Sequence, residues 1–197
     1  ANADIKIVID PGHGGSDPGA CGYDASGNLV LKEKDPNLTI SLKLYEMLKK
    51  SGFDVYMTRD SDTYVSLTGR SDMANNLNAD LFISIHNNAN DNFNTRGTMV
   101  MYAYDTPKEN KSISGKQLAS VIQKHLVEAI PGTNDYGAVK NSALSVVRRT
   151  LMPAVIVESL FVSNEADRNL LMDETVLADI ATAVYEGIVE ILNIQEN

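Results

Sequence analysis

Two histidines and a glutamate follow apolar runs in this sequence, and together they could form a metal site. His13, His86 and Glu158 are the three residues, and the runs before them cover residues 5–9, 81–85 and 154–157. Two imidazoles and a carboxylate suit a tetrahedral zinc ion that keeps one position open for chemistry. The alternative is that each residue has a separate structural role, because a polar residue after a strand is commonly a loop residue with its own hydrogen bonds.

The chain contains few other residues that could bind a transition metal. It has one cysteine, Cys21, which excludes an intramolecular disulfide and a cysteine-rich zinc module. The third histidine, His125, lies on the flank of an expected amphipathic helix, which favours a position at the surface. A metal site must therefore use His13, His86 and carboxylates.

The glycine-rich segment around His13 has a second interpretation, as a phosphate-binding loop. A P-loop would require Gly-Lys followed by Ser or Thr, which does not follow Gly15, and a dinucleotide fingerprint would require glycine where Asp17 stands. We expect the glycines to let the chain turn sharply and bring His13 toward a shared ion, with Asp10 as a hydrogen-bonding partner behind it. An ordinary strand-to-loop turn that includes a histidine is the alternative.

The surrounding elements must bring these residues together, and apolar periodicity predicts alternating strands and helices. Strands are expected at residues 5–9, 53–58, 81–85, 97–104 and 154–157, with a short edge strand at 143–147. Helices are expected from Asp35-Pro36, with Asp35 as the N-cap, to Gly52, and at 66–78, 114–129, 164–172 and 175–192. We predict a single α/β domain over residues 1–197, with a twisted, mostly parallel sheet of about six strands and helices on both faces. Ligands of such sheets bind outside the carboxyl ends of the strands.

Charge and hydropathy exclude several classes of partner. The 197 residues include 17 basic and 26 acidic side chains, a net charge of -9, which disfavours binding to nucleic acid. No stretch approaches the roughly 20 apolar residues of a membrane span. The sequence starts at Ala1 without an initiator Met or a signal peptide, so we expect a mature or excised catalytic piece.

Several blocks of the sequence occur together in the order that is typical of one enzyme family. They cover residues 7–15 and 17–20, 33–35 and 37–38, 58–60 with Leu67 and Arg70, 79–89, and 153–158 with 163–165. With these blocks the chain resembles the zinc-dependent N-acetylmuramoyl-L-alanine amidases of the Amidase_3 type over nearly its whole length. Pro36 departs from the family pattern, which should alter only the entrance of the helix.

The resemblance implies a set of site residues. His13, Glu33 and His86 would bind Zn²⁺, and Glu158 would be the catalytic carboxylate. Only the resemblance identifies Glu33 as a ligand. From its position alone, an acid near the start of a helix more commonly interacts favourably with the helix dipole. The activity that the resemblance implies is hydrolysis of the amide between the lactyl group of N-acetylmuramic acid and L-alanine in peptidoglycan. Glu158 would act as general base and then as general acid.

Other polar residues in these blocks allow two roles each. Asp10 and Asn87 are expected to contact substrate or to support the ligands, although Asn87 could equally cap its loop. Arg59 and Arg70 are expected to form structural ion pairs with nearby acids, Asp60 or Asp72.

The implied partner is peptidoglycan, so we expect action outside the cell or in the cell wall, as an autolysin, a sporulation enzyme or a phage endolysin. An acidic domain should not adhere by itself to anionic wall polymers, so a separate wall-targeting domain is expected. Two other functions stay open: another zinc peptidase that cleaves within the stem peptide, and a noncatalytic wall-binding module.

Overall fold

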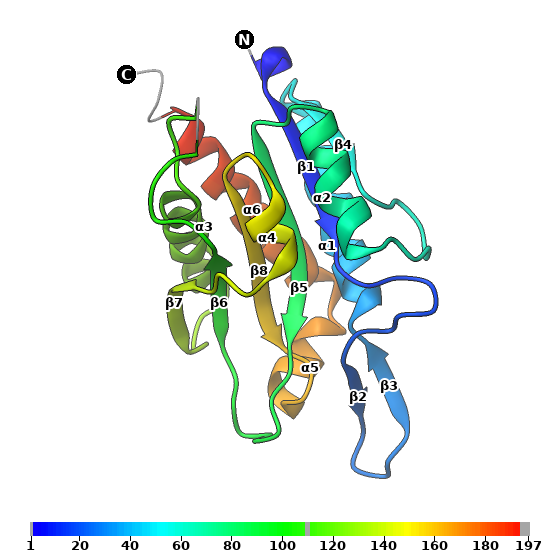
Figure 1. The fold of residues 1–197 in the computed structure, drawn as a ribbon. Helices are drawn as coiled ribbons and strands as arrows, with labels where there is room; N and C mark the ends of the chain where they lie inside the picture. The colour runs from blue at the N-terminus through cyan, green and yellow to red at the C-terminus, as the bar shows by residue number, and fades with distance from the viewer. Residues whose placement is uncertain (1, 109–110, 194–197) are drawn as a thin grey trace.

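Strands and helices alternate along the chain in the computed structural model, which describes residues 2–108 and 111–193 (Figure 1). The strands are β1 (Lys6–Pro11), β2 (Cys21–Tyr23), β3 (Leu29–Lys32), β4 (Asp54–Met57), β5 (Leu81–Asn88), β6 (Thr98–Tyr102), β7 (Asp135–Lys140) and β8 (Ala154–Phe161). The helices are the 3₁₀-helix η1 (Asn2–Asp4) and the α-helices α1 (Lys34–Lys50), α2 (Leu67–Asn76), α3 (Gly115–Ala129), α4 (Ser145–Arg149), α5 (Glu165–Leu171) and α6 (Glu174–Asn193).

Six strands form one sheet in the order β4-β1-β5-β8-β6-β7, and β2 and β3 form a separate antiparallel pair. The strands β4, β1, β5 and β8 are parallel to one another. β6 runs antiparallel to β8, and β7 runs parallel to β6. The predicted mostly parallel six-stranded sheet is therefore confirmed, and it places β1, β5 and β8 side by side at its centre.

Helices cover both faces of the sheet, as the alternation of side chains along each strand requires. On β1, Ile7 and Ile9 pack in a large core under α1, α3 and α6, whereas Val8 packs in a smaller core under α2 and α4 (Figure 1). Each fully buried side chain of this size stabilises the fold by about 1.5–3 kcal/mol. In the described part of the chain, no helix is long and apolar enough to cross a membrane.

Helix α1 begins two residues earlier than the sequence suggests. Its N-cap position is Glu33 rather than Asp35, and the Glu33 side chain makes no capping hydrogen bond. Asp35 and Pro36 lie in the first turn, where a proline removes no intrahelical hydrogen bond. The Glu33 carboxylate therefore caps no backbone N–H of the helix, although its Oε1 accepts a hydrogen bond from Nδ2 of Asn37 over 3.2 Å.

The predicted edge strand at residues 143–147 is wrong, because this segment leads into helix α4. Val146 and Val147 are buried against the face of the sheet, so packing overrides the strand preference of β-branched residues. The edge strand is β7 instead, at Asp135–Lys140. The segment between β1 and α1 also contains structure, since β2 and β3 form a hairpin there.

Candidate functional site

His13 lies in the turn that follows β1, in a backbone conformation that is rare for a residue with a side chain. Its φ is 59°, in the left-handed region. Two arginines hold this turn by its carbonyl groups: Arg59 donates to Pro11 and Gly12, and Arg70 donates to Pro11 and to His13 itself. These charge-assisted hydrogen bonds maintain a turn whose backbone strain costs about 1–3 kcal/mol.

His86 and Glu158 lie within their strands rather than at the ends. β5 continues to Asn88 and β8 continues to Phe161. The two residues are direct partners in the register of these neighbouring parallel strands, so their side chains leave the sheet on the same face. The structure therefore places Glu158 beside His86.

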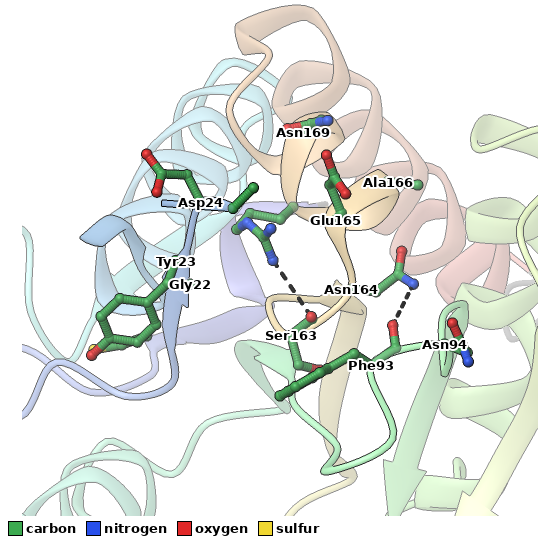
Figure 2. Close-up of a pocket in the computed structure, with 13 residues that line it drawn as sticks. Gly22, Tyr23, Asp24, Phe93, Asn94, Ser163, Asn164, Glu165, Ala166 and Asn169 are labelled. Atoms are coloured by element: carbon green, nitrogen blue, oxygen red, sulfur yellow. Dashed lines mark hydrogen bonds between the residues drawn. The ribbon is translucent and has the colours of Figure 1, made fainter. Parts of the chain in front are cut away.

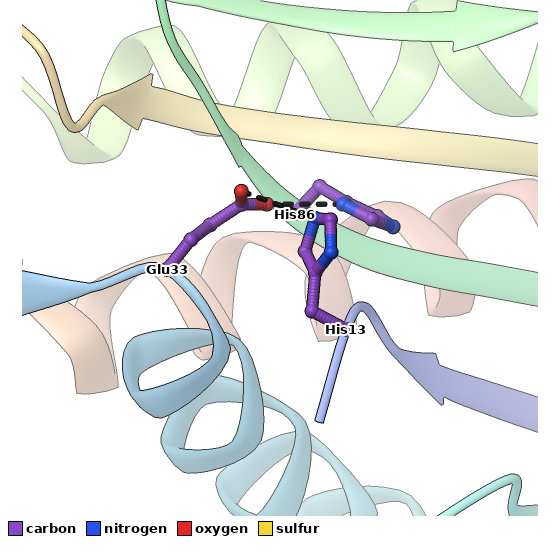
Figure 3. Close-up of side chains that lie close together, drawn as sticks. All are labelled: His13, Glu33 and His86. Atoms are coloured by element: carbon purple, nitrogen blue, oxygen red, sulfur yellow. Dashed lines mark hydrogen bonds and ion pairs between the residues drawn. The ribbon is translucent and has the colours of Figure 1, made fainter. Parts of the chain in front are cut away.

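Glu33 bridges the two histidines (Figure 3). Its Oε2 lies 3.1 Å from Nε2 of His13, and its Oε1 lies 3.0 Å from Nδ1 of His86. One ligand atom from each of these three residues lies within 4.8 Å of the others. The backbone N–H of Ala20, directly before β2, donates to Oε2 over 2.9 Å and fixes the carboxylate. The structure thus brings together the three residues that the resemblance implied as ligands.

Charge within this group favours protonated histidines when no cation lies among them. Burial lowers the pKa of His13, but its hydrogen bonds to Glu33 and Asp17 outweigh burial and raise the pKa to about 9. The pKa of His86 is also raised, because its hydrogen bond to Glu33 outweighs burial. Burial opposes ionisation of Glu33, but the two histidines hold its pKa far below the usual range. A metal ion would replace these protons as the positive charge beside Glu33.

The hydrogen-bonding partner behind His13 is Asp17, and the prediction of Asp10 for this role is wrong. Oδ2 of Asp17 lies 2.8 Å from Nδ1 of His13, so Nε2 faces Glu33. Such a contact fixes the ring orientation and the tautomer of a metal-binding histidine. Asp17 also accepts a hydrogen bond from the N–H of Gly19, which closes the turn around the site.

Asp10 is buried and supports the end of β1. Its carboxylate accepts hydrogen bonds from Thr58, Ser84 and Arg70, and the Arg70 contact is an ion pair of 2.8 Å. The expected pairing of Arg70 with Asp60 or Asp72 is therefore wrong.

Asn87 is buried as well, and its side chain contacts protein groups. Its Nδ2 donates to Asn37 over 2.9 Å, and its Oδ1 accepts from the N–H of Leu160 over 3.3 Å. Its backbone N–H donates to Oε1 of Glu33 over 3.1 Å. In this arrangement Asn87 supports the glutamate and does not open toward solvent.

Two glycines make room for the three side chains. A Cβ atom on Gly12 would lie 2.3 Å from Cε1 and Nε2 of His86. A Cβ atom on Gly19 would lie 2.6 Å from both Oε2 of Glu33 and Cδ2 of His13, and its φ of 67° also favours glycine. The glycines of this segment thus allow close approach of backbone to the site.

Glu158 has the properties of a carboxylate that can exchange a proton near neutral pH. Its side chain is half-buried, and its Oε2 is buried without a hydrogen-bond partner in the described part of the chain. Burial, with a contribution from the negative charge of Glu33, raises its pKa to about 7 although both histidines act to lower it. A general base or acid works best with a pKa close to the working pH.

Two neighbouring cavities lie between the β2–β3 hairpin, the β5–β6 loop and the start of α5. One of about 500 Å³ is lined by Ala20, the residue that donates to Glu33. The other, of about 740 Å³, shares Cys21, Phe93 and Ser163 with the first (Figure 2). A ligand could therefore extend from the three residues along the hairpin.

Comparison with known proteins gives a consistent result. The profile of the family described as N-acetylmuramoyl-L-alanine amidase, Amidase_3, matches residues 7–190. The chain is 38% identical over 183 residues to the N-acetylmuramoyl-L-alanine amidase LytC of Bacillus subtilis, covering 93% of this chain and 34% of LytC. It is 39% identical over 195 residues to the endolysin of Bacillus phage SPP1, covering 97% of this chain and 68% of the endolysin.

A solved structure shares the fold. The N-acetylmuramoyl-L-alanine amidase AmiC2 of Nostoc punctiforme superposes with a TM-score of 0.86 and 34% sequence identity, over 98% of this chain and 99% of that one. The chain spans only about a third of LytC, so the similarity concerns one part of that longer relative. Sequence and fold agree that the chain belongs to the Amidase_3 family of N-acetylmuramoyl-L-alanine amidases.

Proposed function

We propose that residues 1–197 form a single catalytic domain that hydrolyses the amide between the lactyl group of N-acetylmuramic acid and L-alanine of the peptidoglycan stem peptide. The observation that carries this proposal is the His13–Glu33–His86 group with Glu158 beside it on the next strand, in a chain of the amidase family. Two neighbouring cavities, which share three lining residues, offer room for a substrate that is long and extended.

We propose Zn²⁺ as the ion, with His13, Glu33 and His86 as its ligands. Two imidazoles and one carboxylate fit zinc in an open catalytic site. The Asp17 contact at Nδ1 of His13 leaves Nε2 for an ion, which is the arrangement expected of a metal-binding histidine. When bound, zinc supplies a Lewis acid that polarises a carbonyl and makes water a nucleophile at neutral pH.

Glu158 moves the proton in this proposal. It accepts the proton of the attacking water as the new carbon–oxygen bond forms at the lactyl carbonyl. It then donates this proton to the alanine nitrogen as the carbon–nitrogen bond breaks, which leaves a lactyl carboxylate and a peptide with a free amino terminus. The buried Oε2 without a partner and the pKa of about 7 suit a group that alternates between both protonation states.

The proposed substrate implies action in the cell wall or outside the cell. The similar proteins named above include one named as an endolysin, and a third relative is named a sporulation-specific amidase of Bacillus subtilis. With a net charge of -9, this domain should be repelled by anionic wall polymers, so we propose that a separate targeting domain provides attachment.

Digestion of purified peptidoglycan tests the proposal. The expected products are stem peptides that begin with a free L-alanine amino group and glycan strands with free lactyl carboxylates, together with about one zinc per chain by elemental analysis. Peptides cleaved at an internal bond would instead indicate a zinc peptidase. Absence of both products and metal would indicate a noncatalytic wall-binding module.

A further inference from the structure

One arginine in the larger cavity is buried and has no acidic partner. Arg168 on α5 is 8% exposed, and no carboxylate lies within 4.0 Å of its guanidinium in residues 2–108 and 111–193. Its Nη1 donates to the carbonyl groups of Val162 and Ser163, over 3.1 and 3.4 Å. Its Nε and Nη2 make no hydrogen bond to described residues. The buried arginine Arg70 differs, since it pairs with Asp10.

The two acids that line the same cavity do not neutralise Arg168. The Asp24 carboxylate accepts hydrogen bonds from Ser26 and Asn28 in the turn of the hairpin. Glu165 is exposed at the start of α5, and Figure 2 shows it beside Asn169. Because Nε and Nη2 of Arg168 have no partner among the described residues and are not sealed from solvent, the cavity presents a positive site that an anionic ligand can reach.

Arg168 lies beside β2, about two extended residues along the chain from the residue that donates to Glu33. Its side chain packs against Gly22, where a Cβ atom would lie 2.4 Å from Cδ of Arg168. Gly22 is two residues along the chain from Ala20, which donates to Glu33, and two extended residues span about 7 Å. A substrate group bound by Arg168 would therefore belong to one of the first residues of the stem peptide, on the alanine side of the cleaved amide.

We propose that Arg168 binds a carboxylate of the stem peptide and makes the domain prefer stem peptides in which this group is free over those in which it is amidated. This inference rests on the proposed function, because that function supplies the peptide. The Nε and Nη2 groups of an arginine form a fork that pairs with both oxygens of a carboxylate, whereas a carboxamide offers one acceptor and no charge.

Equilibrium binding of product peptides tests the inference without requiring hydrolysis. The probes are the tripeptide L-Ala-γ-D-Glu-L-Lys and two analogues, amidated either at the second residue or at the third. For the unmodified domain, one of these amidations should raise Kd by about tenfold, which identifies the carboxylate that is bound. In Arg168→Gln that difference should disappear, and Arg168→Lys should keep part of it. Arg148→Gln, an exposed arginine on α4, is the matched control and should keep all of it.

Equal Kd values for the three peptides with the unmodified domain would overturn the inference, whatever the variants do. It would also be overturned if Arg168→Gln weakened all three peptides equally, because that is the effect of losing the contacts to Val162 and Ser163. Thermal unfolding of each variant separates this structural effect from loss of recognition. Failure of the proposed function would look different, since the binding preference would persist without cleavage of peptidoglycan.

Discussion

Replacing Glu158 with glutamine should abolish activity and at the same time stabilise the metal-free protein above neutral pH. Glutamine has the size of glutamate but carries no charge and cannot exchange a proton. The Oε2 of Glu158 is buried without a partner, so the ionised form is poorly solvated in the folded state. The same feature that suits the residue to proton transfer therefore costs stability.

The size of the effect follows from the pKa. Burial raises the pKa of Glu158 from the ordinary 4.5 to about 7, and each pKa unit corresponds to about 1.4 kcal/mol. Because the folded-state value is raised, the folded protein binds this proton more tightly than the unfolded chain. That stabilisation is fully present below pH 4.5 and is lost as pH rises through 7. The free energy of unfolding of Glu158→Gln minus that of the unmodified protein should therefore be larger above pH 7 than below pH 4.5. The increase should be up to about 3 kcal/mol.

Urea unfolding of metal-free protein, measured between about pH 5 and about pH 8, tests this expectation. The free energy of unfolding of Glu158→Gln should fall less over this range than that of the unmodified protein. Glu46→Gln removes an exposed carboxylate on α1 and is the matched control, which should follow the unmodified protein. Parallel curves for Glu158→Gln and the unmodified protein would refute the argument that Glu158 is a poorly solvated carboxylate.

The catalytic half of this prediction is measured on the zinc-loaded enzyme. Loss of a general base and acid should lower kcat by about 10²–10⁴, while the zinc content stays that of the unmodified protein because Glu158 is not among the proposed ligands. Release of stem peptides by Glu158→Gln at a near-normal rate would remove Glu158 from the mechanism. Loss of zinc from the variant would instead make it a ligand.

Three further outcomes concern the proposed ligands. Asp17→Ala should weaken zinc binding by about 10–100-fold, measured by competition with a chromophoric chelator, since it removes the partner of Nδ1 of His13; unchanged affinity would contradict that role. Gly12→Ala should lower the zinc content and the activity together, because the added Cβ would lie 2.3 Å from the His86 ring, and a fully loaded, active variant would show that the ring can shift freely. Free zinc at about 100 times its Kd should raise the free energy of unfolding by about 2.7 kcal/mol, and a chelator should reverse this; a melting temperature insensitive to both would argue against a preformed zinc site.

Five strands of the sheet and two of the proposed ligands could be predicted from apolar periodicity alone, but the edge strand β7 could not. Runs at residues 5–9 and 81–85 set the positions of His13 and His86, because neighbouring parallel strands end at the same edge. Glu33 could not be found in this way. Its place depends on the β2–β3 hairpin and on the true start of α1, and neither follows from periodicity. The order of the family's sequence blocks was the only signal for it.

The assignment of Asp10 failed for a reason that strand alternation explains. Asp10 is two residues after Val8, so it points to the face of the sheet that α2 covers, and Arg70 on α2 pairs with it there. Asp17, which contacts His13, lies beyond the strand in a turn of glycines, where no periodic pattern predicts direction. Alternation could have excluded Asp10 as the partner of His13, but only the folded turn identifies Asp17.

Two sets of groups hold the site, one of arginine side chains and one of backbone N–H groups. Arg59 and Arg70 bind the carbonyl groups of the turn at residues 11–13, so the strained backbone of His13 is stabilised by charges behind the site, away from the proposed ion. Glu33 is fixed by N–H groups of Ala20 and Asn87, which leaves both of its oxygens directed at the histidines. The donors are therefore in place before an ion binds, and the protons on His13 and His86 are what an ion must displace. Glu158 is held by neither set, and a carboxylate that must accept and then release a proton is best left without a fixed partner.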